Sequence, residues 1–281
     1  MSLSNGRHLV VTSTLGRTVG HGALAGAVAG GLGAAAQYWL VEPSIRAAIA
    51  IEEAGAAASE AGDHSHAAAD QATGHSHAAD VLVSRGEQVI FGMVTVLLVG
   101  ILIGIAFALV HRFLGSRLPG RTAAGSAMAL AGLGFVAFTL APAIAVPANP
   151  PAAGDPATVD LRTLTYLGTI VCCAALTALV TGLARAKDLA SESRAAAATA
   201  VGIVGTAVLI WALPDAADPV PTNVPTDLVW QFRVGSLTQI GLMWLVLGAA
   251  FAYLLPGRGP SRPSSAPADV RRPAMPGVPG Q

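Results

Sequence analysis

Long runs of apolar residues dominate the chain and are separated by short polar stretches. Six runs approach or exceed the roughly 17–25 residues that a membrane-spanning helix needs. They lie at about 19–41, 88–111, 122–146, 164–184, 195–213 and 236–255. None shows the strict apolar and polar alternation of an outer-membrane strand. Because a helix satisfies its own backbone hydrogen bonds in lipid, the pattern predicts an all-α integral membrane bundle of about six transmembrane helices.

The charge distribution supports this prediction and gives it an orientation. Of the 281 residues, 53% are hydrophobic and only 11% are charged, against about 25% charged in a soluble domain. With the N-terminus in the cytoplasm, twelve of the sixteen Lys and Arg residues lie inside, and thirteen of the sixteen acidic residues lie outside. This is the bias of the positive-inside rule. We expect a multi-pass protein of the cell (inner) membrane, with both termini cytoplasmic and an outer face that attracts cations.

Recurring residues divide the six spans into three helical hairpins. Each odd-numbered span ends at a proline, and each even-numbered span begins with an arginine. The prolines are in Glu42-Pro43, Ala141-Pro142 and Leu213-Pro214, and the arginines are Arg85, Arg162 and Arg233. We infer three related hairpins, a repeat of the kind that transporter folds often carry, with convergent loop chemistry as the alternative.

Four-residue glycine spacing predicts how the first two spans pack. Gly22, Gly26 and Gly30 lie in the first span, and Gly100 and Gly104 lie in the second. Small residues at this spacing let two helix backbones approach closely in lipid. We expect these glycines to form a packing face.

The polar segments complete the domain organisation. Residues 1–18 are expected to form a cytoplasmic N-terminal segment, followed by a transmembrane domain at 19–255. A long external loop covers 43–87, and its first part, 44–58, has the composition of a helix. Residues 256–281 are rich in proline, serine and arginine. Such a composition cannot bury enough apolar surface to fold alone, so a disordered cytoplasmic tail is predicted.

The external loop carries two His-x-His pairs among acidic residues, and these are the candidate metal ligands. They are His64, His66, His75 and His77, with Asp63 and Asp70 beside them. Imidazole and carboxylate groups suit Co²⁺, Ni²⁺ or Zn²⁺. The pattern has no fixed spacing such as H-E-x-x-H. Two interpretations remain open: weak metal collection, or a solvated low-complexity loop.

Polar side chains near the outer ends of the spans are candidates for an ion path or its mouth. They are Gln37, Glu42, Glu52, Glu53, Gln88, Gln239, Arg85, Arg162 and Arg233. Buried polar groups in lipid either bond between helices or mark a path. The three arginines should pair with the acids nearest to them in sequence, which are Glu87, Asp160 and Asp227. Such pairs would anchor the hairpins or shape an external vestibule.

Several of these segments together resemble the CbtA family of predicted cobalt transporter subunits. The resemblance rests on Glu42-Pro43, on Ala48-Ile49-Ala50-Ile51-Glu52-Glu53-Ala54, on the His-rich loop and on Arg85-Gly86-Glu87-Gln88. Further along, it rests on Pro147-Ala148-Asn149-Pro150-Pro151, on residues 160–166, on Phe232-Arg233 and on Ser236-Leu237. It implies cobalt uptake linked to cobalamin synthesis, beside CbtB, a small single-span protein with its own histidine-rich end. Family members are commonly described with five spans, whereas the charge pattern here favours six.

The chain is expected to be a transporter subunit rather than an enzyme. Phosphate-binding loops, dinucleotide turns and the G-x-S-x-G and H-E-x-x-H motifs are missing from the sequence. Neither a tightly bound cofactor nor a nucleic-acid partner is expected, and Co²⁺ is the expected cargo, with Ni²⁺ or Zn²⁺ as alternatives. Self-association in the lipid bilayer is open. The alternative function is a non-transporting membrane scaffold or metal sensor that acts through a partner subunit.

Overall fold

The computed structural model describes residues 5–63, 84–118, 120, 122–151, 153–186, 190–212, 214 and 224–255. Within these ranges the chain is helical and has no strand. Five helical stretches are long and apolar enough to cross a membrane. They are Thr14–Ala58, Arg85–Arg117, Ala123–Ala145, Pro156–Leu183 and Thr226–Leu254. A further helix, α7 (Ser191–Ala212), has 22 residues and so is about 33 Å long. The protein is a multi-pass helical membrane bundle, as the apolar runs predict.

The first span and the start of the predicted loop form one helical rod. It consists of α1 (Asn5–Ala36), the π-helix η1 (Gln37–Val41) and α2 (Glu42–Asp63). The loop expected at 43–87 is therefore helical as far as residue 63. The alanine-rich composition of this stretch favours the helix, and the helix expected at 44–58 lies within α2. The next described residue is Ser84, which is the N-cap of α3 (Arg85–Leu114).

Two of the proline exits share an unusual backbone feature. The π-helix η1 ends just before Glu42-Pro43, and a second π-helix, η3 (Val136–Leu140), ends just before Ala141-Pro142. In each, the residue before the proline donates its N–H to the carbonyl five residues earlier. Proline has no N–H and its ring collides with the carbonyl of an ordinary helical turn, and a wider turn relieves that collision. The first two odd-numbered spans thus repeat a structure as well as a sequence feature.

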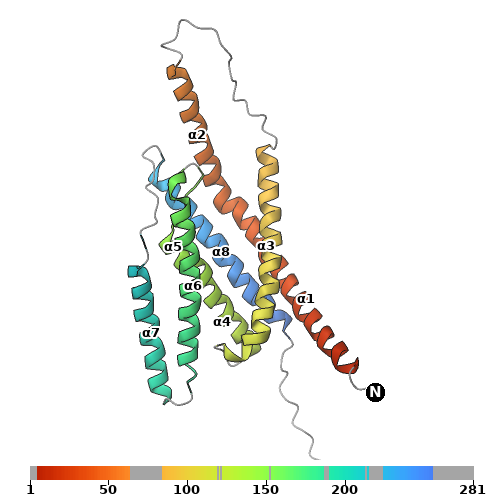
Figure 1. The fold of residues 1–281 in the computed structure, drawn as a ribbon. Coiled ribbons are helices and arrows are strands. Elements are labelled where there is room, and N and C mark those ends of the chain that lie inside the picture. Colours follow the sequence, from red (N-terminus) through yellow and green to blue (C-terminus); the bar gives the residue numbers. More distant parts are fainter. Residues whose placement is uncertain are drawn as a thin grey trace, which may run out of the picture.

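Six long helical segments run alternately up and down the bundle (Figure 1). After α3 and a short 3-10 helix η2 (Gly115–Arg117), the chain rises through α4 (Ala123–Phe135), η3 and α5 (Ala141–Ala145). It returns through η4 (Pro156–Thr158) and α6 (Val159–Leu183), rises through α7 and descends through α8 (Thr226–Leu254). We call the end that holds η1, α5 and the starts of α3, α6 and α8 the upper end. α1 begins and α8 ends at the opposite, lower end.

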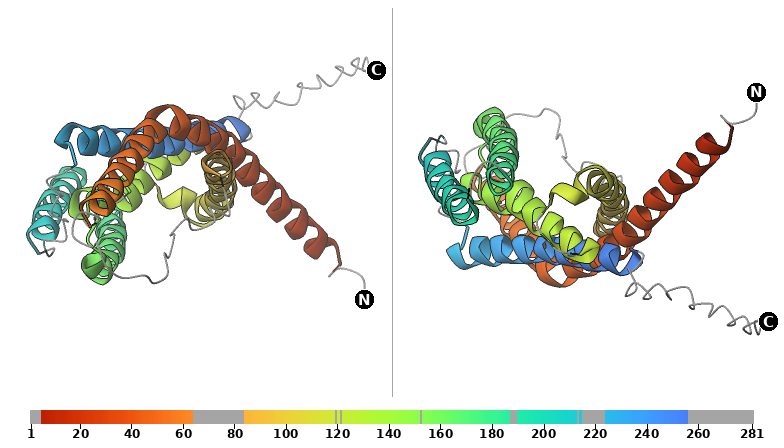
Figure 2. Two further views of the ribbon diagram at one scale, coloured as in Figure 1. Left: turned by 90° about the horizontal axis from the view of Figure 1, so that it is seen from above. Right: turned by 90° about the horizontal axis from the view of Figure 1, so that it is seen from below.

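The glycine face predicted from the sequence joins α1 to α3. A Cβ atom on Gly26 would collide with the carbonyl oxygen of Gly100, and one on Gly104 would collide with the carbonyl of Gly22. Gly30 also lies close to the backbone of Leu97, where an added Cβ atom would stand 2.9 Å from the carbonyl oxygen. The first hairpin is therefore closed by backbone contact. Seen from above and below, the start of α1 projects beyond this contact, away from the other helices (Figure 2).

Helix α8 joins the first hairpin to the second, which is formed by α4, η3, α5 and α6. On one face Gly235 approaches the carbonyl of Leu40 in η1, and Gly33 of α1 accommodates Met243. On the other face the ring of Trp244 fills the space left by Gly134 of α4. The indole nitrogen of Trp244 donates to Thr139 Oγ1 in η3 at 3.0 Å. Helix α7 packs against α6 instead of α8, so the last two long helices lie apart.

Candidate functional site

A buried carboxylate lies at the upper end of the first hairpin, where the rod bends into α2. Glu42 is only 4% exposed. Arg85, the first residue of α3, donates from Nη2 to both carboxylate oxygens at 2.9 and 2.8 Å, across 43 residues of sequence. Arg46 donates from Nε to Glu42 Oε1 at 2.9 Å, from one turn along α2. We refer to Glu42, Arg85 and Arg46 as the Glu42 clamp.

The prediction that Arg85 pairs with Glu87 is wrong. Glu87 instead accepts a hydrogen bond from the backbone N–H of Ser84 at 2.7 Å, while the Ser84 hydroxyl accepts from the Glu87 N–H. This reciprocal capping box starts α3 and occupies the nearest carboxylate. The guanidinium of Arg85 is therefore directed to Glu42 on the first hairpin's other helix. Its Nη1 also donates to Gln88 Oε1, three residues along α3, at 3.1 Å.

The side chains of the Glu42 clamp differ in solvent exposure, and their charges do not cancel. The Glu42 side chain is 6% exposed, whereas those of Arg85 and Arg46 are 37% and 57% exposed. One carboxylate faces two guanidinium groups, so the cluster carries an excess of positive charge. Arg85 Nε is buried and has no hydrogen-bond partner among the described residues. In this arrangement the carboxylate is fully engaged and does not present a free face to a cation.

Two glutamines continue inward from the clamp. The Gln37 amide nitrogen lies close to Gly92 of α3, 3.2 Å from where a Cβ atom would stand. Gln239 is buried on α8, between Gly235 and Met243, on the face that meets η1 and α1. Gln37 thus bridges the first hairpin below Glu42, and Gln239 lies on the helix that covers its side.

The other two arginines at the upper end, Arg233 and Arg162, are not part of the Glu42 clamp. Arg233 of α8 does not pair with Asp227. It donates from Nε to the carbonyl of Ala148 at 3.0 Å and from Nη2 to Asn149 Oδ1 at 2.7 Å. Arg162 is half-buried on α6. Glu52 and Glu53 are exposed on α2, beyond the clamp.

The candidate metal ligands of the loop are not brought together in the described structure. His64, His66, Asp70, His75 and His77 lie outside the described residues, and Asp63 is the last residue of α2. Within the described ranges, no three His, Cys, Asp or Glu side chains are grouped so that they could hold a metal ion.

One polar contact at the lower end was not predicted from the sequence. His111 Nε2 lies 2.9 Å from Ser126 Oγ, and the Ser126 hydroxyl donates to the carbonyl of Ala123. The His111 ring also packs edge-on against Phe251, with 5.3 Å between ring centroids. This contact ties α3, α4 and α8 together. The only signal in the sequence is a histidine at the end of an apolar run, which is also common at membrane interfaces.

Comparison with known proteins identifies the family. A family model described as "Probable cobalt transporter subunit (CbtA)" matches residues 15–256, and so covers the bundle and the clamp. No match is found among curated proteins or among solved structures. The family description points to a transporter subunit rather than an enzyme, to cobalt as the ion, and to a partner protein. The chain belongs to the CbtA family of probable cobalt transporter subunits.

Proposed function

We propose that this chain is the membrane-spanning subunit of a cobalt uptake system that supplies cobalamin synthesis, with its upper end facing outward. The observation that carries the proposal is Glu42, a carboxylate buried at the entrance to the first hairpin. Ionisable groups at membrane depth are costly and tend to mark ion pathways. Both termini would then be cytoplasmic, in agreement with the distribution of Lys and Arg along the sequence.

In this proposal the segment between α2 and α3 collects the metal. His64, His66, His75 and His77, helped by Asp63 and Asp70, raise the local concentration of Co²⁺ at the upper end. The segment joins the end of α2 to Ser84, the residue just before Arg85. Metal capture would therefore act close to the group that holds Glu42.

Entry of the ion requires the clamp to open. The Nη2 group of Arg85, which donates to both carboxylate oxygens, and Co²⁺ compete for the same ligand atoms. When Arg85 withdraws, Glu42 becomes an anionic ligand, and the amide oxygens of Gln37, Gln88 and Gln239 offer further oxygen ligands. Opening is helped because Arg85 Nε is buried without a partner in the closed form, and an unsatisfied buried donor costs about 1–3 kcal/mol.

Cobalt uptake by whole cells tests the role of Glu42. Glu42→Gln is expected to abolish most uptake per folded protein, because an amide cannot replace the anionic ligand. Arg85→Gln is expected to retain or raise uptake per folded protein, because it frees Glu42. The matched control is Glu87→Gln, which makes the same charge change beside Arg85 and keeps a capping side chain at that position. If Glu42→Gln transports normally, the path does not use this carboxylate.

Deletion of residues 63–77 tests the collecting segment. We expect uptake to fall at low cobalt concentration and to recover at high concentration, because the segment only raises local supply. Competition by Ni²⁺ and Zn²⁺ in the same cells compares the ions, since N/O sites alone favour Ni²⁺ over Co²⁺. Unchanged cobalt accumulation after deletion of the whole gene would refute the uptake proposal.

A second candidate is a scaffold or metal sensor that acts through a partner, in this proposal a small single-span CbtB-type subunit. It is favoured by the closed clamp and by the absence of a grouped ligand set within the described residues. Reconstitution in liposomes separates the two: cobalt flux through this chain alone supports a permease, and flux only after the partner is added supports a scaffold.

A further inference from the structure

Arg233 has a charge that none of the described carboxylates balances. Its two hydrogen bonds go to neutral oxygens, the Ala148 carbonyl and the Asn149 side chain. Across the described part of the chain, no carboxylate lies within ion-pair distance of it. A half-buried guanidinium near a membrane interface favours an anionic partner, and its planar fork matches a phosphate group.

A cavity of about 370 Å³ opens beside Arg233, between α5, α6 and α8. Its lining residues include Tyr166, Ser236 and Trp230. Tyr166 is 41% and Trp230 67% exposed. Exposed Tyr and Trp side chains of membrane proteins gather at the level of lipid headgroups. The cavity beside Arg233 is therefore at the depth of a lipid phosphate, although most of its other lining residues are apolar.

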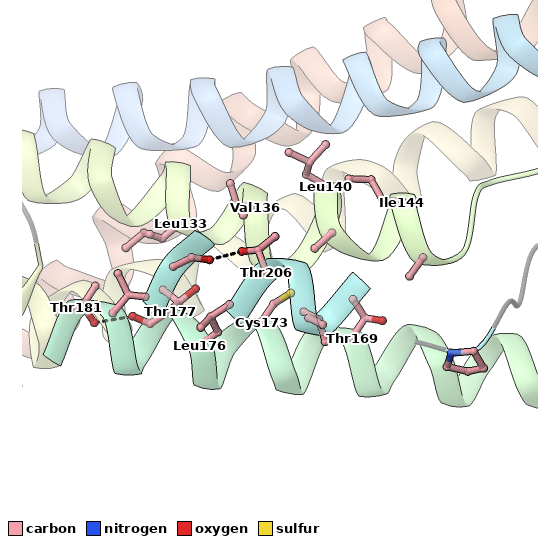
Figure 3. Close-up of a pocket in the computed structure, with 16 residues that line it drawn as sticks. Leu133, Val136, Leu140, Ile144, Thr169, Cys173, Leu176, Thr177, Thr181 and Thr206 are labelled. Atoms are coloured by element: carbon pink, nitrogen blue, oxygen red, sulfur yellow. Dashed lines mark hydrogen bonds between the residues drawn. The ribbon is translucent and has the colours of Figure 1, made fainter. Parts of the chain in front are cut away.

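A second, apolar cavity of about 490 Å³ adjoins the first and runs along α6 between α4, α5 and α7. Ile144 of α5 borders both cavities. Figure 3 shows Leu133, Val136, Leu140 and Ile144 facing a row of α6 side chains across this space. On α6 the wall extends from Thr169 to Thr181, about 18 Å along the helix axis. Its length is close to half the thickness of a bilayer's hydrocarbon core, which is about 15 Å.

The walls of the long cavity suit hydrocarbon, although several of its residues are threonines. Thr169 donates to the Thr165 carbonyl, Thr181 to the Thr177 carbonyl, and Thr206 of α7 to the Gly202 carbonyl. Each of these hydroxyl groups donates its proton to its own helix, so none has to find a hydrogen-bond acceptor in the cavity. The cavity lies where α7 stands away from α4 and α8, so an occupant would fill the space between the helices.

From this arrangement we infer that the protein binds one anionic phospholipid at the upper end. Its phosphate is held by Arg233, with Tyr166 and Ser236 as neutral donors. One acyl chain passes Ile144 and lies in the cavity along α6, between α4 and α7. The bound lipid serves as a structural link that keeps α7 against the rest of the bundle. This inference does not depend on the direction or cargo of transport.

Native mass spectrometry of the delipidated full-length protein in detergent tests the inference. The probes are phosphatidylglycerol, phosphatidylcholine, glycerophosphoglycerol, which has the head group without acyl chains, and inorganic phosphate. We expect one phosphatidylglycerol per chain, bound more tightly than phosphatidylcholine. Arg233→Gln should weaken it about tenfold or more, because a charge-assisted contact is lost, and Arg233→Lys should keep more of the binding. Arg162→Gln, at an upper-end arginine that lines neither cavity, should leave binding unchanged.

A second variant tests the acyl-chain part separately. Ala145 lines only the long cavity, and Ala145→Phe fills it while leaving Arg233 intact. We expect this variant to lose phosphatidylglycerol and to elute from size exclusion like the wild type. Equal binding by wild type and Arg233→Gln would overturn the phosphate site. Unchanged binding by Ala145→Phe, or equal competition by glycerophosphoglycerol, would overturn the acyl-chain site.

Discussion

The Glu42 clamp gives a quantitative prediction for stability. Replacing Arg85 with glutamine removes both of its hydrogen bonds to a carboxylate that is 4% exposed. Removing one partner of a fully buried ion pair costs about 3–5 kcal/mol. Here Arg85 is 37% exposed and Arg46 remains at 2.9 Å from Glu42, so the cost is reduced. We expect a loss of about 2 kcal/mol, which corresponds to a fall in Tm of roughly 4–8 °C.

The assay is thermal unfolding of the purified protein in detergent, followed by tryptophan fluorescence. Glu42→Gln, Arg85→Gln and the double variant complete a double-mutant cycle. We expect the double variant to be less destabilised than the two single changes added together, because neither partner is then left charged without the other. Arg46→Gln is the matched control. It removes an exposed partner of the same carboxylate, and should cost much less stability than Arg85→Gln.

Two results would refute this reasoning. If the effects of Glu42→Gln and Arg85→Gln simply add, the two side chains are not energetically coupled, whatever their distance. If Arg46→Gln is as harmful as Arg85→Gln, the burial of the pair does not determine its strength.

Three further predictions concern packing and helix ends. Gly26→Ala should disrupt the first hairpin, because its Cβ atom would collide with the backbone of α3. Gly31→Ala should be tolerated, because nothing lies within 4 Å of that position. Crosslinking between cysteines placed on α1 and α3 compares the two variants. Trp244→Phe removes the hydrogen bond to Thr139 and the part of the indole that packs beside Gly134, and should lower stability by about 1–3 kcal/mol in thermal unfolding. Ser84→Ala removes the N-cap of α3 and should cost about 1 kcal/mol, with hydrogen exchange fastest in the first turn of α3.

Much of the fold could be predicted from the sequence because lipid imposes simple rules. Long apolar runs in lipid favour helices, and glycines spaced four residues apart in such a run favour close contact with another helix, as at Gly26 and Gly100. The first span continues as a helix further into α2 than the sequence analysis expected. Pro43 indicates an exit from the membrane but does not mark the end of a helix. The wider turn of η1 accommodates that proline without breaking the rod.

The candidate site was predicted less well because its contacts are long-range. Glu42 and Arg85 were both candidates, but their pairing depends on how α1 and α3 cross, which the glycine face fixes only once the hairpin has folded. The sequence favoured Glu87 as the partner of Arg85, because it is the nearest carboxylate. In the structure Glu87 instead accepts a hydrogen bond from the backbone N–H of Ser84. The position of α7 against α6 depends in the same way on interhelical packing that hydropathy does not describe.

The two π-helical exits provide an internal comparison that bears on the role of Glu42. In both, a π-helix is followed by one residue and a proline, and the residue before the proline closes the wide turn with its backbone N–H. That residue is Glu42 in the first hairpin and Ala141 in the second. Since alanine is sufficient to form the turn, the backbone does not require a carboxylate there. Burial of the Glu42 carboxylate costs desolvation energy, and the formation of the turn does not explain that cost. The carboxylate is instead paired with Arg85 of the neighbouring helix. We therefore propose the first hairpin as the ion entrance of the proposed transporter.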